Sequence, residues 1–116
     1  MTYIKINDNL IEATIRGFTT DREWDNRESK AITMEMSYDE TIALFTNNVK
    51  WSIVYQAAEY VNEEGKTVKP EPVEYDNSDY CISGAITDNR DGTITIKMGK
   101  LTDLEETLIL LYGGIA

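Results

Sequence analysis

The chain has 116 residues, of which 41% are hydrophobic and 28% are charged, so it is long enough to bury one core without a metal or a disulfide. We therefore expect a single domain over residues 1–116. Its net charge of −10 repels phosphate backbones and argues against a nucleic-acid partner. No apolar run approaches the ~18 residues of a membrane span, and the N-terminus lacks the basic and apolar regions of a signal peptide. We expect a soluble cytoplasmic protein that does not bind membranes.

Two strand pairs are predicted in the first half of the chain. Residues 3–6 and 10–17 alternate in hydrophobicity on either side of the turn-forming residues 7–9, which predicts a hairpin. Residues 29–36 alternate again. They predict a strand that follows a long irregular connection, residues 18–28.

A capped helix is predicted next. Ser37 precedes Glu40 by three residues, which is the spacing of a capping box, so we expect a helix from Tyr38 to about Asn48. Its apolar residues recur at helical spacing and predict one stripe that packs on the sheet. These residues are Tyr38, Ile42, Phe45 and Val49.

The second half opens with a strand and a long acidic segment. Residues 50–56 predict a central strand, because Trp51 and Ile53 share one face and Val54 indicates burial on the other. Residues 57–79 contain both prolines and, from residue 59 on, seven acids against two bases. We expect an acidic loop or an exposed hairpin arm there, since loops of this length in a small domain are usually functional or mobile.

The clearest hairpin joins residues 80–87 to residues 93–99 through the turn at residues 88–92. Its first strand pattern contains the only cysteine, Cys81, for which we expect a buried thiol in a reducing compartment.

A second capping box pairs Thr102 with Glu105 and predicts a second helix. Its expected buried stripe is Leu104, Leu108 and Leu111. The predicted stop is Gly113-Gly114.

These elements indicate an α+β fold with one mainly antiparallel sheet or half-open barrel of about five to six strands, covered by two capped helices. Residues 10–48 and 80–112 both read as strand, connection, strand and helix, which suggests a pseudo-repeat. The alternative is that any alternating strand followed by an amphipathic helix looks similar, because both elements favour the same residue types.

Candidate chemistry is sparse. The chain has no histidine, which is the commonest general base and metal ligand. Asp21, Glu23 and Asp25 alternate as ligands of a hard cation do, but the glycine and terminal glutamate of a calcium loop are missing. We expect no enzymatic activity, no catalytic residue, no metal and no cofactor.

Two segments have the composition of a protein interface. Arg22, Trp24 and Arg27 combine an aromatic anchor with arginines, although Trp24 packed on the core is an equal alternative. Tyr60 and Tyr75 lie among acids in the arm, where a solvated loop is the alternative. Both segments suggest a protein partner or self-association into a homo-oligomer.

Residues 22–33 and 91–105 resemble segments of small uncharacterised proteins encoded in the structural-gene regions of Firmicutes prophages. This resemblance implies a virion-associated or tail-associated accessory protein, located in the host cell or in the virion. It implies no catalytic residue.

Two functions follow as hypotheses. The first is a non-enzymatic structural or assembly protein that associates with itself or with another virion protein through Trp24 and the flanking arginines. The second is an acidic inhibitor or adaptor whose arm binds a basic surface on a host protein.

Overall fold

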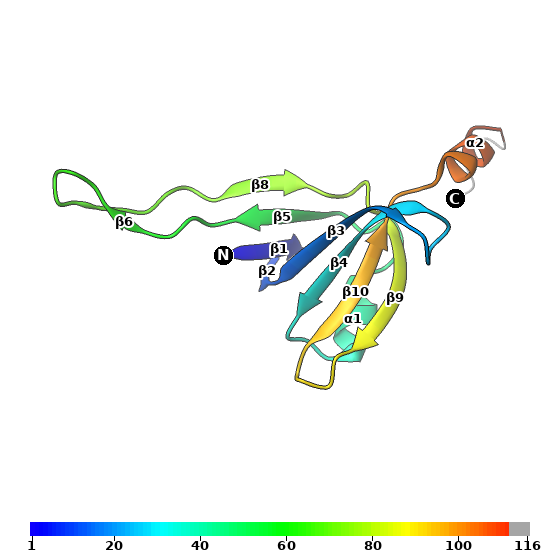
Figure 1. Cartoon of the computed structure of the whole chain (residues 1–116), viewed down its shortest axis with the longest axis horizontal. Helices are drawn as coiled ribbons and strands as arrows, with labels where there is room; N and C mark the ends of the chain where they lie inside the picture. Colours follow the sequence, from blue (N-terminus) through cyan, green and yellow to red (C-terminus); the bar gives the residue numbers. More distant parts are fainter. Residues whose placement is uncertain (112–116) are drawn as a thin grey trace.

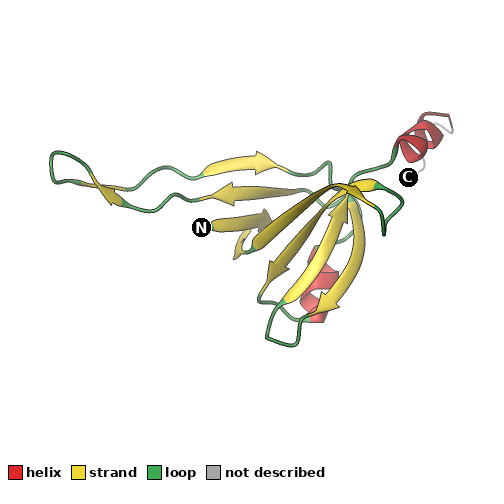
Figure 2. Cartoon of the chain, in the orientation of Figure 1, coloured by secondary structure: helices red, strands yellow, loops and turns green. Residues whose placement is uncertain are grey.

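Figure 1 shows the computed structural model, which describes residues 1–111 and consists mainly of antiparallel strands with two helices (Figures 1 and 2). The strands are β1 (Thr2–Ile6), β2 (Asn9–Glu12), β3 (Thr14–Asp21), β4 (Arg27–Met34), β5 (Trp51–Tyr55), β6 (Tyr60–Val61), β7 (Thr67–Val68), β8 (Val73–Asp76), β9 (Ile82–Asp88) and β10 (Ile94–Gly99). The helices are α1 (Tyr38–Leu44) and α2 (Asp103–Leu111). The α+β class and the antiparallel pairing expected from the sequence are confirmed.

Two four-stranded sheets enclose the core. One has the order β2-β1-β5-β8 and is called the arm sheet here, and the other has the order β3-β4-β10-β9 and is called the hairpin sheet. Alternate residues of each strand face inward. Ile4, Ile53 and Trp51 of the arm sheet form one buried cluster with Ile32 and Ile96 of the hairpin sheet. The core therefore lies between the two sheets, with β5 in the interior of its sheet as the sequence predicts.

The structure corrects the expected strand number. We expected one sheet of about five to six strands, whereas the described residues contain ten strands in three sheets. The segment 10–17 divides at Ala13 into β2 and β3, which belong to different sheets, and the acidic arm supplies β6, β7 and β8. The long connection 18–28 is also shorter than expected, because β3 extends to Asp21 and β4 begins at Arg27.

The predicted turns are present. Asn7 and Asp8 adopt positive φ angles of 50° and 64° between the paired residues Ile6 and Asn9, as a two-residue hairpin turn requires. The acidic segment forms the predicted exposed hairpin arm, in which β8 pairs with β5, and β6 pairs with β7. The arm extends from the body in Figure 1.

The hairpin sheet is arranged as the predicted pseudo-repeat would be. Strands β4 and β10 pair in antiparallel fashion with Ile32 opposite Ile96 and Thr33 opposite Thr95, and the two threonine hydroxyls lie 2.7 Å apart. The hairpin β3-β4 and the hairpin β9-β10 therefore lie on either side of this threonine pair. The helices that follow do not share this arrangement, and an origin by duplication stays a prediction.

Helix α1 is shorter than expected. The Ser37 hydroxyl accepts a hydrogen bond from the Glu40 backbone N–H at 3.1 Å, which confirms the predicted cap. The helix ends at Leu44, and its buried face consists of Thr41 and the adjoining Phe45. The expected stripe is therefore wrong within the helix, because α1 turns the face of Thr41 towards the core instead of the face of Tyr38 and Ile42. Its residues Tyr38 and Ile42 are exposed, whereas Phe45 is buried and Val49 is partly buried against the core.

Helix α2 departs further from expectation. The predicted capping box is present, but no residue from Asp103 to Leu111 is buried. The expected buried stripe of leucines is instead exposed, because the helix extends away from both sheets (Figure 1). The predicted stop at Gly113-Gly114 lies outside the described residues.

The turn that joins β3 to β4 folds over the outer face of the hairpin sheet. The Trp24 ring lies on Gly84 of β9 and Gly99 of β10, where a Cβ atom would come within 2.5 Å and 2.8 Å of the ring. Both positions therefore require glycine for steric reasons. The packing of Trp24 on the sheet is the alternative that the sequence left open.

Gly84→Ala should destabilise the protein by ~1–3 kcal/mol, because the new methyl group overlaps the Trp24 ring. Chemical denaturation measures this change. Gly17→Ala is the matched control, because nothing lies within 4 Å of its Cβ position, and it should change stability by less than about 0.5 kcal/mol. In a Trp24→Ala background the effect of Gly84→Ala should largely disappear. Equal losses in both backgrounds would contradict the proposed contact.

Candidate functional site

The arm sheet is longer than the hairpin sheet that covers it. On β5 the inward residues are Trp51 and Ile53, which are buried, and then Tyr55, which is 46% exposed. Val73 and Tyr75, opposite on β8, are 50% and 54% exposed. The same face of one sheet therefore changes from core to surface within five residues.

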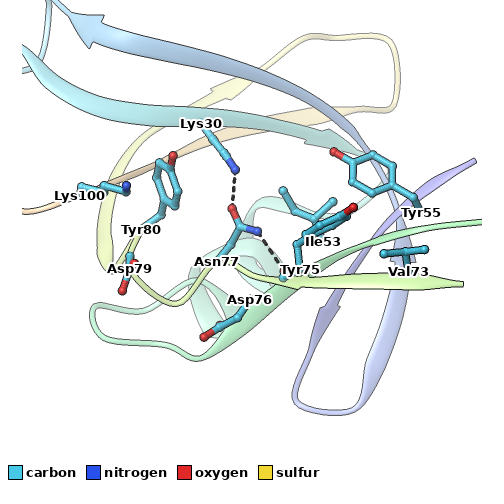
Figure 3. A pocket seen from close by; sticks show the side chains of 10 residues that line it. All are labelled: Lys30, Ile53, Tyr55, Val73, Tyr75, Asp76, Asn77, Asp79, Tyr80 and Lys100. Atoms are coloured by element: carbon cyan, nitrogen blue, oxygen red, sulfur yellow. Dashed lines mark hydrogen bonds between the residues drawn. The ribbon is translucent and has the colours of Figure 1, made fainter.

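This uncovered face forms one wall of a groove of about 630 Å³ at the base of the arm, called the arm groove here (Figure 3). Tyr55 and Tyr75 pack edge to face with ring centroids 5.7 Å apart. The lining residues are Lys30, Ile53, Tyr55, Val73, Tyr75, Asp76, Asn77, Asp79, Tyr80 and Lys100.

Two lysines and a tyrosine form the other end of the arm groove. The Nζ atoms of Lys30 and Lys100 lie 4.5 Å and 5.0 Å from the centre of the Tyr80 ring. The Tyr80 hydroxyl donates a short hydrogen bond to Glu28, which also forms an ion pair with Lys100 at 3.1 Å. Burial lowers the pKa of Lys30 and, together with the Glu28 carboxylate, raises the pKa of Tyr80. At neutral pH Tyr80 therefore stays a neutral donor.

One acid of the arm groove lining, Asp76, is held in a local turn. Asp76 accepts hydrogen bonds from the Ser78 backbone N–H at 3.0 Å and from the Ser78 hydroxyl at 2.6 Å, which lower its pKa. It follows Tyr75 on β8, and strand alternation directs it to the opposite face. Figure 3 shows the Lys30 amino group donating to the Asn77 side chain, between Tyr80 and the aromatic wall, with Lys100 on the far side of Tyr80.

A buried arginine holds the base of α2. The Arg27 guanidinium donates to both carboxylate oxygens of Glu105, at 2.8 Å and 3.2 Å, and to the Lys100 carbonyl at 2.9 Å. It also stacks over the Trp24 ring at 4.7 Å, and its side chain is only 4% exposed. Bidentate pairing of this kind fixes direction as well as distance. The first turn of α2 is therefore locked to the outer face of the hairpin sheet.

The capping box adds to this anchor. The Thr102 N–H donates to Glu105 at 2.8 Å, and the Glu105 N–H donates to the Thr102 hydroxyl at 3.2 Å. Hydrogen bonds from Arg27 and from the Thr102 backbone hold the pKa of Glu105 below its usual value. One glutamate thus closes the helix cap and pairs with the buried arginine.

Helix α2 presents an apolar face that no described residue covers. Leu104, Leu108 and Leu111 recur at spacings of four and three, which places them on one side of a helix. Their exposed fractions are 69%, 40% and 72%. Leu110 lies about 120° from this stripe and is 83% exposed.

The five predicted interface residues lie in three separate places. Trp24 and Arg27 pack on the outer face of the hairpin sheet, and Arg22 is exposed beside them. Tyr75 lines the arm groove, whereas Tyr60 is exposed in β6, towards the tip of the arm. Whether they bind a partner stays a prediction.

Sequence reasoning missed the two lysines of the arm groove and the role of Glu105. Lys30 and Lys100 are 70 residues apart in the chain and meet only because β4 and β10 are neighbours. Glu105 was identified as a capping residue, but its partner Arg27 is 78 residues away. The sequence predicts the leucine stripe of α2 correctly as one face of a helix, but that face is exposed and not buried as expected.

Asp21, which the sequence placed in a weak cation pattern, is buried with the Ser29 hydroxyl at 3.0 Å and Lys97 at 2.9 Å. Cys81 is a free thiol of intermediate exposure, less buried than expected. Residues 1–111 contain no group of three metal-binding side chains. None of the helices in this part of the chain is long and apolar enough to cross a membrane.

Comparison of the chain with known protein families, with curated proteins and with solved structures gives no match.

Acid should release the base of α2. The pKa of Glu105 is lowered in the folded state, so its contribution to stability is present above the ordinary value of 4.5 and is lost as pH falls below it. The ¹³Cα shifts of residues 103–108 should move towards coil values between about pH 5 and pH 3.

Glu105→Gln should give the released shifts already at pH 7, because the neutral amide cannot pair with Arg27 as a carboxylate does. Glu106→Gln is the control, since Glu106 is exposed and its neighbour Glu105 holds the anchor. Identical shifts in both variants at pH 7 would show that the ion pair does not hold α2.

Proposed function

We propose that this protein is a non-enzymatic structural or assembly protein that works by association with copies of itself, in a phage virion or tail. The observation that carries this proposal is that an elongated molecule leaves two separate apolar surfaces uncovered, the leucine stripe of α2 and the aromatic wall of the arm groove. The radius of gyration is 17.0 Å and the longest extent is 60 Å, whereas a compact domain of this length has a radius of about 13 Å.

The exposed leucines and tyrosines support association on energetic grounds. Burial of one leucine side chain contributes ~1.5–3 kcal/mol, while association of two proteins costs ~4–15 kcal/mol in lost freedom. The α2 stripe has three leucines, which barely offset this cost. A stable contact therefore needs a second apolar surface as well, and the aromatic wall of the arm groove is such a surface.

The phage context rests on the resemblance of residues 22–33 and 91–105 to prophage-encoded proteins. The first segment contains the Trp24 turn and most of β4, and the second contains β10 and the start of α2. Both segments thus include parts that hold α2 outward. A protein that presents a helix and an arm away from its body suits an assembly role.

The protein should form a defined oligomer at micromolar concentration, measured by size-exclusion chromatography with light scattering. Leu104→Ser with Leu108→Ser should shift it towards monomer, because these side chains are exposed in one copy and contribute little to its own fold. Circular dichroism should stay native. A monomeric wild type up to 100 μM would argue against self-association.

The alternative function, an acidic adaptor for a basic host protein, is favoured by one observation. The seven acids of residues 59–79 are all exposed, and Glu74 is the one that forms an ion pair, with Lys5 at 3.4 Å, among the described residues. Such a surface attracts basic partners through long-range electrostatics.

A partner captured from host lysate by this acidic surface should elute between about 0.15 M and 0.5 M salt, because exposed charges are screened within that range. Replacement of Glu63 and Glu64 by Gln should lower its capture several-fold, whereas Glu35→Gln with Glu40→Gln on the body should not. Retention above 1 M salt would rule out a charge-driven contact.

A further inference from the structure

We infer that α2 of one copy docks in the arm groove of a second copy, so that the molecules associate head to tail. This inference rests on the self-association proposed above and names the two surfaces that meet.

The two surfaces match in chemistry. The α2 stripe offers leucine side chains, and the arm groove offers Tyr55, Val73 and Tyr75, each about half exposed. These three residues occupy positions that face the core in the rest of the arm sheet, so they lack the cover that their neighbours receive from the hairpin sheet. An amphipathic helix laid in an apolar groove is a common mode of recognition.

A molecule does not cover its own groove with its own helix. Arg27 pairs with Glu105 and with the Lys100 carbonyl, and the Lys100 N–H donates to the Glu28 carbonyl at 2.9 Å. These contacts hold both sides of the short connection between β10 and α2. They direct the helix away from the arm, as Figure 1 shows. The described helix of the same molecule therefore leaves this groove open to α2 of a second copy.

The acids of α2 favour the arm groove over a second copy of α2 as the surface that α2 contacts. Helix α2 has three acids, Asp103, Glu105 and Glu106, and no base. Two such helices packed together would bring like charges close. The arm groove instead has Lys30 near its aromatic wall, while Lys100 is paired with Glu28 and the lining also includes Asp76 and Asp79. The charge of the arm groove is therefore mixed, whereas that of α2 is purely acidic.

A contact between two different surfaces leaves a free groove and a free helix at the ends of each pair. Further copies then add until a ring closes or a filament grows. The geometry therefore points to an oligomer larger than a dimer.

The test is a complementation experiment with two variants. The helix variant is Leu104→Ser with Leu108→Ser, which keeps the groove, and the groove variant is Val73→Glu, which keeps the helix and places a carboxylate opposite its acids. Leu110→Ser, off the stripe, and Val61→Glu, in the short outer strand pair of the arm, are the matched controls, since both residues are highly exposed.

Each variant alone should be monomeric by light scattering at a concentration where the wild type and both controls form the oligomer. An equimolar mixture of the helix variant and the groove variant should give a one-to-one complex that grows no further, because only one productive pair of surfaces remains. Formation of this complex also shows that both variants are folded.

Other outcomes overturn the inference. Assembly that persists in the groove variant would mean that α2 binds elsewhere, and a mixture that stays monomeric would exclude docking between these two surfaces. In both cases the wild-type oligomer would leave the proposed self-association intact. A monomeric wild type would overturn both proposals together.

Discussion

Arg27 stands where the Trp24 turn, the hairpin sheet and the first turn of α2 meet. Its guanidinium is almost fully buried, stacks on Trp24 and forms a bidentate pair with Glu105. A buried charge of this kind is tolerated when it is well paired, and here the two terminal nitrogens supply the pairing, whereas Nε has no hydrogen-bond partner among the described residues. The pairing sets the direction of α2, and through it the position of the leucine stripe relative to the arm. The external surfaces of the molecule thus depend on one internal ion pair.

The unequal length of the two sheets also shapes the surface of the molecule. Where the hairpin sheet ends, the inward side of the arm sheet continues without cover and becomes the aromatic wall of the arm groove. Contiguous exposed apolar area is uncommon on monomeric proteins and usually marks a contact site. The exposed helix and the arm groove share this property and lie on different elements. A single chain therefore presents two apolar surfaces that its own fold does not bring together.

Prediction from the sequence succeeded wherever the cause of a structure is local. The turn at Asn7 and Asp8, the caps at Ser37 and Thr102 and the strand alternation all depend on neighbours within a few residues. The interface prediction included Tyr75, which lines the arm groove, because an aromatic residue among acids is a local feature, and its role in binding stays a prediction. It did not reach Lys30 and Lys100, which come together only through the pairing of β4 with β10. The burial of the helices was misjudged because amphipathic spacing describes a face without identifying what covers it.

By itself the sequence determined the element types, the turns, the helix starts and the exposed acidic arm. Hydrogen bonds and steric limits between near neighbours specify these features, so they can be predicted from short segments of the sequence. Only the tertiary structure decided that ten strands divide between two packed sheets and an arm, that Trp24 lies on two glycines, and that α2 is left without cover. These outcomes depend on contacts such as that of Arg27 with Glu105, 78 residues apart. Whether such residues meet is set by the packing of the whole chain.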